Sequence, residues 1–167
     1  MGTQEMLRFE VQGVPHDVAM EYVPAAVDRQ KMLADLKKMV ETATRLIGDV
    51  PHKRYAFLLV GKGNGRVEHL NSASIACNGN SLLGESGYRG WLSYVSDEYF
   101  HNFNVKRIRP IAVGPFDYDS KNLTNMLWVS EGLSVYYQDV VTERAGLMTR
   151  SQYLERLQSA MGKFSPL

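Results

Sequence analysis

The spacing of apolar positions along the chain changes near residue 27. Before that point apolar and polar residues partly alternate, which is typical of short strands with one buried face. From about 27 to 47, apolar residues recur every three or four positions, and Gly48 follows them. This predicts an amphipathic helix that ends at a glycine. Its apolar stripe consists of Met32, Leu33, Leu36, Met39, Val40, Ala43, Leu46 and Ile47.

The middle of the chain predicts two strands joined by a glycine-rich turn. The first strand is "RYAFLLV" at 54–60, and the turn is "GKGNG" at 61–65. The segment "RVEHLNSASIA" at 66–76 is expected to return as one strand. Neither of its faces is plainly apolar, which indicates an edge strand lining a cleft.

The second half of the chain predicts helices. They are expected over about 88–103, over about 121–144 with Asp119 or Ser120 as N-cap, and from near Thr149. An extended, proline-containing connector separates the first two. Strands first and helices afterwards indicate an α+β fold rather than a doubly wound sheet.

Length and composition narrow the function classes. With 167 residues, 44% of them hydrophobic, residues 1–167 are expected to form a single domain excised from a longer protein. A net charge of +1 gives no electrostatic footprint for nucleic acid. The longest apolar run, residues 55–60, is too short for a membrane span, and the N-terminal residues lack the parts of a signal peptide. These features leave the compartment open.

The segment "DEYFH" at 97–101 differs by one residue from H-E-x-x-H, the helical zinc signature of metallopeptidases. On a helix, Asp97 and His101 lie on one face a turn apart and can both reach one metal ion. Glu98 can lean toward the same site as a general base. Taken alone, the motif also fits an exposed acidic turn beside an unrelated histidine.

A second carboxylate lies in the apolar segment "NMLWVSEGLSVYY" at 125–137. Burying Glu131 there would cost free energy unless it were paired or bound a metal, whereas on a solvent-facing side it needs no partner. Gly132 lowers helix stability, which suggests that another backbone or a substrate passes close to it.

Three segments together resemble the glycyl aminopeptidase family of zinc metallopeptidases, whose members often carry a PDZ domain. They are "DEYFHNFNVKRIRP" at 97–110, "LWVSEGLSVYY" at 127–137 and "RVEHLNS" at 66–72. Further similar stretches extend the likeness over nearly the whole chain in the same order. The resemblance implies a thermolysin-like catalytic domain, with a strand-rich N-terminal part packed on a helical part that carries the metal site.

The resemblance also assigns roles to five residues. It implies that His101 and Glu131 are zinc ligands, that Glu98 is the general base, and that Asp97 occupies the place of the missing histidine ligand. By similarity to aminopeptidase N enzymes, Glu68 would hold the free α-amine of a peptide substrate. An edge strand can pair with such a peptide. From the residues alone, Glu68 also fits an ordinary solvated glutamate.

Aspartate in place of histidine changes the expected metal chemistry. Its side chain is shorter, and the resulting ligand set is harder, so manganese or magnesium compete better with zinc. The added negative charge also opposes ionisation of a bound water. Two functions therefore stay open: metal-dependent peptide hydrolysis impaired by Asp97, and an inactive pseudopeptidase that binds peptides.

Overall fold

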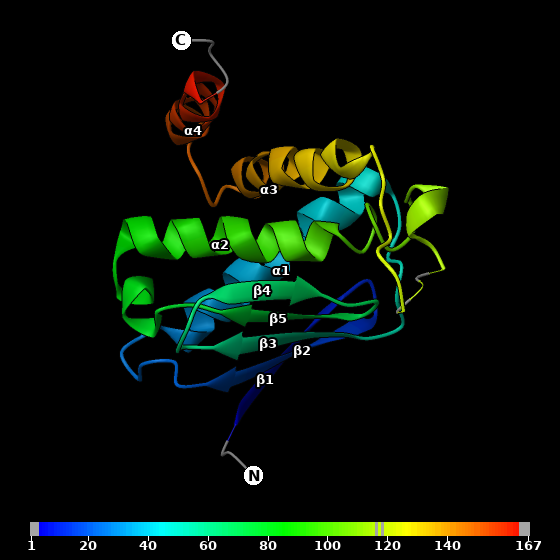
Figure 1. Ribbon diagram of the computed structural model, residues 1–167. Helices are drawn as coiled ribbons and strands as arrows, with labels where there is room; N and C mark the ends of the chain where they lie inside the picture. The colour runs from blue at the N-terminus through cyan, green and yellow to red at the C-terminus, as the bar shows by residue number, and fades with distance from the viewer. Residues whose placement is uncertain (1–3, 116, 118, 164–167) are drawn as a thin grey trace.

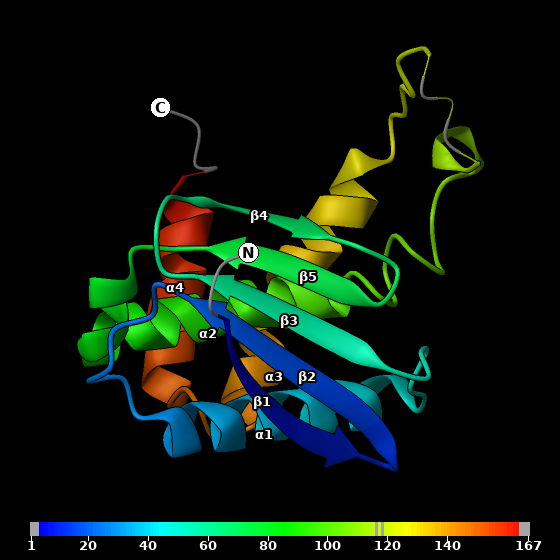
Figure 2. The same ribbon diagram turned by 90° about the horizontal axis from the view of Figure 1, so that it is seen from below.

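The computed structural model describes residues 4–163 except residues 116 and 118. Its framework is a mixed five-stranded sheet in the order β1-β2-β3-β5-β4 (Figures 1 and 2). The pairs β1–β2 and β4–β5 are antiparallel, whereas β3 runs parallel to both of its neighbours. The strands are β1 Glu5–Val11, β2 Val14–Glu21, β3 Tyr55–Val60, β4 Gly65–Glu68 and β5 Ser72–Ala76.

The helices of the described residues all lie on the same side of this sheet. In Figure 1, α1 and α2 form the layer next to the strands, α3 lies on the outer side of α2, and α4 follows it. The predicted α+β class is confirmed. The helices are α1 Arg29–Ile47, α2 Glu85–Phe100, α3 Leu133–Arg144 and α4 Arg150–Gly162.

Helix α1 follows its sequence pattern closely. The Asp28 side chain caps its start by accepting a hydrogen bond of 2.9 Å from the Lys31 amide. Gly48 ends it with a φ of +88°, a left-handed conformation that glycine adopts without strain. The apolar stripe packs into one core with the sheet and α2, which includes Met32, Leu36, Phe57 and Val95.

The expected single strand at 66–76 is instead a hairpin made of β4 and β5. A turn at 69–71 separates them, and the His69 amide donates to the Ser72 carbonyl across it at 2.8 Å. Strand β5 pairs with β3 on its other side, so β4 is left as an edge strand of the sheet. The segment was expected to be an edge strand. This is correct for β4 but not for β5, which lies inside the sheet.

The expected helix at 121–144 begins later than predicted. Residues 121–126 are not helical, a π-helical turn covers Trp128–Gly132, and α3 starts at Leu133. Local side-chain bonds explain the difference. Asn122 donates to the Asp117 carbonyl at 2.7 Å, and Ser120 donates to the Asp117 carboxylate at 2.6 Å, so neither expected cap closes a helix.

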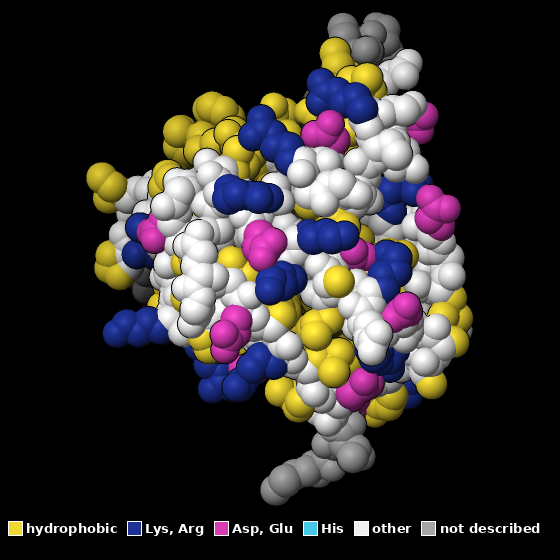
Figure 3. All heavy atoms as spheres, turned by 180° about the vertical axis from the view of Figure 1, so that it is seen from behind, with side chains coloured by type: hydrophobic (Ala, Val, Ile, Leu, Met, Phe, Trp, Pro, Cys, Tyr) yellow, Lys and Arg dark blue, Asp and Glu magenta, His cyan; other side chains and the backbone are white. Residues whose placement is uncertain are grey.

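The last helix starts where it was expected. Thr149 and Gln152 form a capping box at the start of α4. The helices of the described residues are too short or too polar to cross a membrane. On the face drawn in Figure 3, basic and acidic side chains are interspersed.

Candidate metal centre

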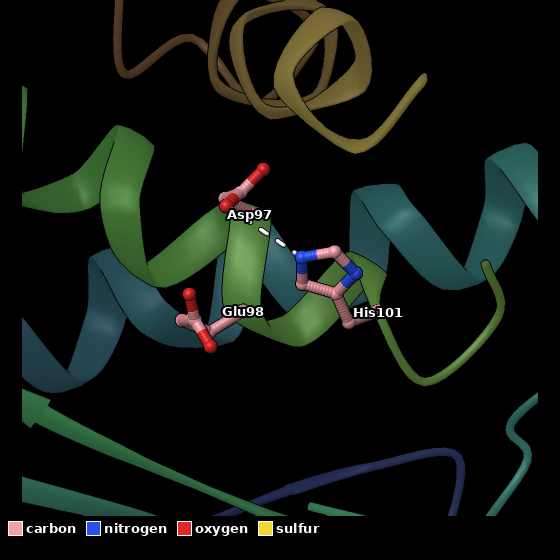
Figure 4. A group of neighbouring side chains, drawn as sticks. All are labelled: Asp97, Glu98 and His101. Carbon is pink, nitrogen blue, oxygen red and sulfur yellow. Dashed lines mark ion pairs between the residues drawn. The ribbon is translucent and has the colours of Figure 1, made fainter. Parts of the chain in front are cut away.

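The last turn of α2 brings three potential ligands together. Asp97, Glu98 and His101 are only 1%, 3% and 3% exposed. One ligand atom of each lies within 4.8 Å of those of the other two (Figure 4). The Nε2 atom of His101 lies 3.8 Å from Oδ2 of Asp97, the proximity that their spacing of four residues predicts.

The orientation of His101 leaves one ring nitrogen free for a ligand. Its Nδ1 lies 3.1 Å from the carbonyl oxygen of Asn104, which can only accept a hydrogen bond. In the neutral ring Nδ1 therefore carries the proton, and Nε2 presents a lone pair on the side of Asp97. Histidines that bind metals are commonly oriented by such a bond from the other nitrogen.

Asn104 also ties the π-helical turn to the end of α2. Its Nδ2 lies 2.9 Å from the Val129 carbonyl, 2.7 Å from the Ser130 carbonyl and 3.0 Å from the Ser134 hydroxyl. Ser134 Oγ is in turn 3.2 Å from His101 Nδ1. The same asparagine thus connects the histidine with the turn that carries Glu131.

Glu131 lies on this turn but outside the buried cluster of Asp97, Glu98 and His101. Its side chain is exposed, and so are the apolar residues Trp128, Leu133 and Val135 around it, so the apolar stretch does not bury the carboxylate. Its charge is nevertheless close enough to raise the pKa of Asp97. A Cβ added at Gly132 would meet no atom within 4 Å, so no other described backbone passes close there, and of the two expected neighbours only a substrate is left.

Arg66 on β4 is the cation that the structure adds to this cluster. Its Nη2 lies 3.1 Å from Asp97 Oδ2, and its Nε lies 2.9 Å from Glu98 Oε1. Sequence reasoning did not identify Arg66. The sequence does contain an indication of its position. Alternate residues of a strand share a face, and Arg66 precedes Glu68 by two positions, so both side chains lie on the same face of β4.

Burial controls the protonation of the two carboxylates. Desolvation raises the pKa of Asp97, while Arg66 and His101 oppose the rise. Desolvation likewise raises the pKa of Glu98 to about 7, with Arg66 opposing and Asp97 adding to the rise. A carboxylate with this pKa can both take up and release a proton near neutral pH.

Glu68 lies at the end of the edge strand and is already paired. Its Oε1 is 3.2 Å from Nζ of Lys106, whose side chain is 17% exposed. Burial opposes ionisation of Glu68, but hydrogen bonding by its own backbone amide and the Lys106 charge bring its pKa below the ordinary value. The carboxylate proposed to hold a peptide amine thus holds the chain's own ammonium group.

A divalent cation fits the residues of this cluster. Asp97 Oδ1 and Glu98 Oε2 are buried and have no hydrogen-bond partner among the described residues. The Asp97 oxygen and the lone pair of His101 Nε2 can serve as ligands, and Glu98 Oε2 belongs to the same cluster as a potential proton acceptor. This ligand set is harder than one with two imidazoles, so it suits manganese as well as zinc.

Two comparisons with known proteins agree with this geometry. The family model for M61 glycyl aminopeptidase matches residues 90–166, which include α2 from Gly90 onward and the π-helical turn. A crystal structure described as an aminopeptidase N family protein from Idiomarina loihiensis superposes with a TM-score of 0.86 at 29% sequence identity. The predicted resemblance to the glycyl aminopeptidase family is confirmed over residues 90–166.

The match with the Idiomarina structure covers different shares of the two chains. It covers 92% of this chain and 27% of the other. The chain thus spans about a quarter of the length of that aminopeptidase N family protein. A comparison with curated protein sequences found no match.

Proposed function

We propose that this chain is the catalytic segment of a metal-dependent aminopeptidase with a thermolysin-like arrangement, which hydrolyses peptides from a free N-terminus. The observation that carries the proposal is the buried cluster at the end of α2. It combines an oriented histidine with two carboxylate oxygens that lack partners among the described residues, within a segment that matches a peptidase family.

In this proposal Asp97, His101 and the downstream Glu131 hold a zinc or manganese ion. Such an ion, when bound, would polarise the peptide carbonyl and make a water molecule more acidic. Glu98 takes the proton of the attacking water and passes it to the leaving amine. Its pKa of about 7 suits both steps, because such a group gains and loses a proton readily at neutral pH.

The edge of the sheet is the proposed binding place of the peptide. An extended peptide can add to β4 through main-chain hydrogen bonds, which fixes its register. Glu68 at the end of this strand would then receive the N-terminal ammonium group in place of Lys106. This exchange of one ammonium for another would explain a requirement for a free N-terminus.

Hydrolysis of short peptides in zinc-containing or manganese-containing buffer tests the proposal. Peptides with a free N-terminus and a small first residue should be cleaved, and their N-acetylated counterparts should not. Glu98→Gln should abolish cleavage while sparing metal binding, because an amide cannot accept the proton. No cleavage across a broad peptide library by a metal-loaded protein would refute the hydrolase proposal.

One observation favours the pseudopeptidase as a second candidate. Arg66 bonds to Asp97 and Glu98, so the cluster already contains a positive charge without a metal. A peptide-binding module would use the same edge strand without turnover. Peptide binding measured by calorimetry, together with no cleavage at saturating metal, would favour this alternative.

A further inference from the structure

We propose that Arg66 is a built-in competitor of the metal ion: its guanidinium group neutralises Asp97 and Glu98 in the metal-free protein and must leave before a divalent cation binds. The inference rests on the proposed metal site, but it requires no turnover. In this proposal Arg66, on the edge strand β4, controls the affinity of the site for metal.

Charge balance is the first argument. Two neighbouring carboxylates that are almost fully buried carry a large desolvation cost unless a cation contacts them. Among the described residues, Arg66 is the cation that contacts both carboxylates. Its planar guanidinium group reaches Asp97 through Nη2 and Glu98 through Nε. His101, the next basic group, contacts only Asp97 among them and at the longer distance of 3.8 Å.

The second argument is that arginine and metal need the same two carboxylates. Arg66 uses Oδ2 of Asp97, which is also the oxygen that faces His101 Nε2. A divalent ion held by the free Oδ1 of Asp97 and by Nε2 of His101, with Glu98 beside it, would lie next to the guanidinium group, and neighbouring cations repel each other. Arg66 and a bound metal therefore exclude one another.

The third argument is that Arg66 has somewhere to go. Its side chain is 32% exposed, and its guanidinium carbon lies 4.5 Å from the centre of the Tyr94 ring. A cavity of about 660 Å³ lies between the sheet edge and α2, lined by Arg66 and Tyr94 together with Gly65, Gly87 and Trp91. The guanidinium can turn into this cavity and stay stacked on Tyr94 while a metal takes its place.

Calorimetric titration with zinc and with manganese tests the competition. Arg66→Gln removes the charge, so it should raise the affinity for both metals by at least about tenfold. Arg66→Lys keeps a charge that cannot contact both carboxylates in the same way. The metal affinity of this variant should therefore lie between those of the native and Arg66→Gln proteins. Arg8→Gln is a matched control, because Arg8 also pairs from an edge strand with a buried aspartate, Asp17, and should leave metal affinity unchanged.

A second measurement needs no substitution. In the native chain, nuclear magnetic resonance should show the Arg66 Nε–H signal shifting and its exchange with water speeding up as zinc is added, because the bond to Glu98 breaks. An unchanged signal at saturating zinc would overturn the proposal. So would equal metal affinities of the native and Arg66→Gln proteins, including no binding by either.

The outcomes separate this inference from the proposed function. Tighter metal binding by Arg66→Gln with no peptide cleavage would support the competition and refute the hydrolase. Cleavage by the native chain with equal metal affinity in Arg66→Gln would support the hydrolase and refute the competition. Thermal unfolding in the presence of a chelator should show a lower midpoint for Arg66→Gln, because its buried carboxylates then lack a cation.

Discussion

Glu98→Gln should make the fold sensitive to acid, because it removes one of two titrations that oppose each other. The other titration belongs to His16 and His52, which lie beneath α2 against the ring of Tyr99. His16 Nδ1 is 3.0 Å from the Val14 carbonyl, so it donates there and its Nε2 accepts from His52 Nε2 at 3.3 Å. The His16 ring is therefore neutral in the folded protein, and burial, which lowers the pKa of His52 to about 4, keeps that ring neutral near pH 7.

The signs of the two contributions follow from their pKa values. Burial lowers the pKa of both histidines from 6.5 to about 4, so the unfolded chain takes up more protons between these values and stability falls as the pH falls. Burial raises the pKa of Glu98 from 4.5 to about 7. Over nearly the same pH range the folded chain therefore takes up more protons than the unfolded chain, and this contribution to stability rises as the pH falls.

The magnitudes are similar. At about 1.4 kcal/mol per pKa unit, the fully buried His16 costs about 3 kcal/mol by pH 4.5, and the partly exposed His52 adds less. Glu98 contributes about 3 kcal/mol in the other direction. Between pH 7 and 4.5 the Glu98→Gln protein should therefore lose about 3 kcal/mol more stability than the native protein.

Urea unfolding at pH 7 and at pH 4.5 measures this difference. Adding His16→Phe to Glu98→Gln should remove most of the extra acid sensitivity, because phenylalanine keeps a ring but does not titrate. Parallel pH profiles for the native and Glu98→Gln proteins would refute the reasoning.

Three other predictions concern the metal, the substrate and the fold. Asp97→His should bind zinc at least about tenfold more tightly in calorimetry, since it restores a nitrogen ligand and removes a negative charge; an equal affinity would show that Asp97 does not impair binding. Glu68→Ala should reduce the preference for free over acetylated N-termini in competition binding or cleavage assays, whereas an unchanged preference would assign the amine to another group. Asp28→Ala should lower the free energy of unfolding by about 1 kcal/mol, seen as a lower urea midpoint, because α1 loses its N-cap.

The features that could be predicted from sequence are those set by local geometry. Helix α1 has an apolar stripe, a capping aspartate and a terminal glycine, and each of these acts within a few residues. The proximity of Asp97 and His101 follows from helical spacing alone. Neither needed knowledge of how distant segments pack.

The features that could not be predicted depend on distant contacts or on weak local signals. The hairpin at 65–76 turns at His69-Leu70-Asn71, which contains no glycine or proline, and its register is set by the pairing of β5 with β3. The contact of Arg66 with α2 joins two elements that are far apart in the sequence. The start of α3 was obscured by the bonds of Asn122 to Asp117, which compete with a helix.

The bonds of Asn104 have a consequence for motion. The same side chain holds two carbonyls of the π-helical turn, and its own carbonyl holds the ring of His101. A displacement of the turn that carries Glu131 must therefore break these bonds or carry the end of α2 with it. In hydrogen exchange, the amides of residues 128–132 should open together with those of residues 100–104 rather than fray independently. The two segments would then respond to a bound ligand as one rigid unit on slow timescales.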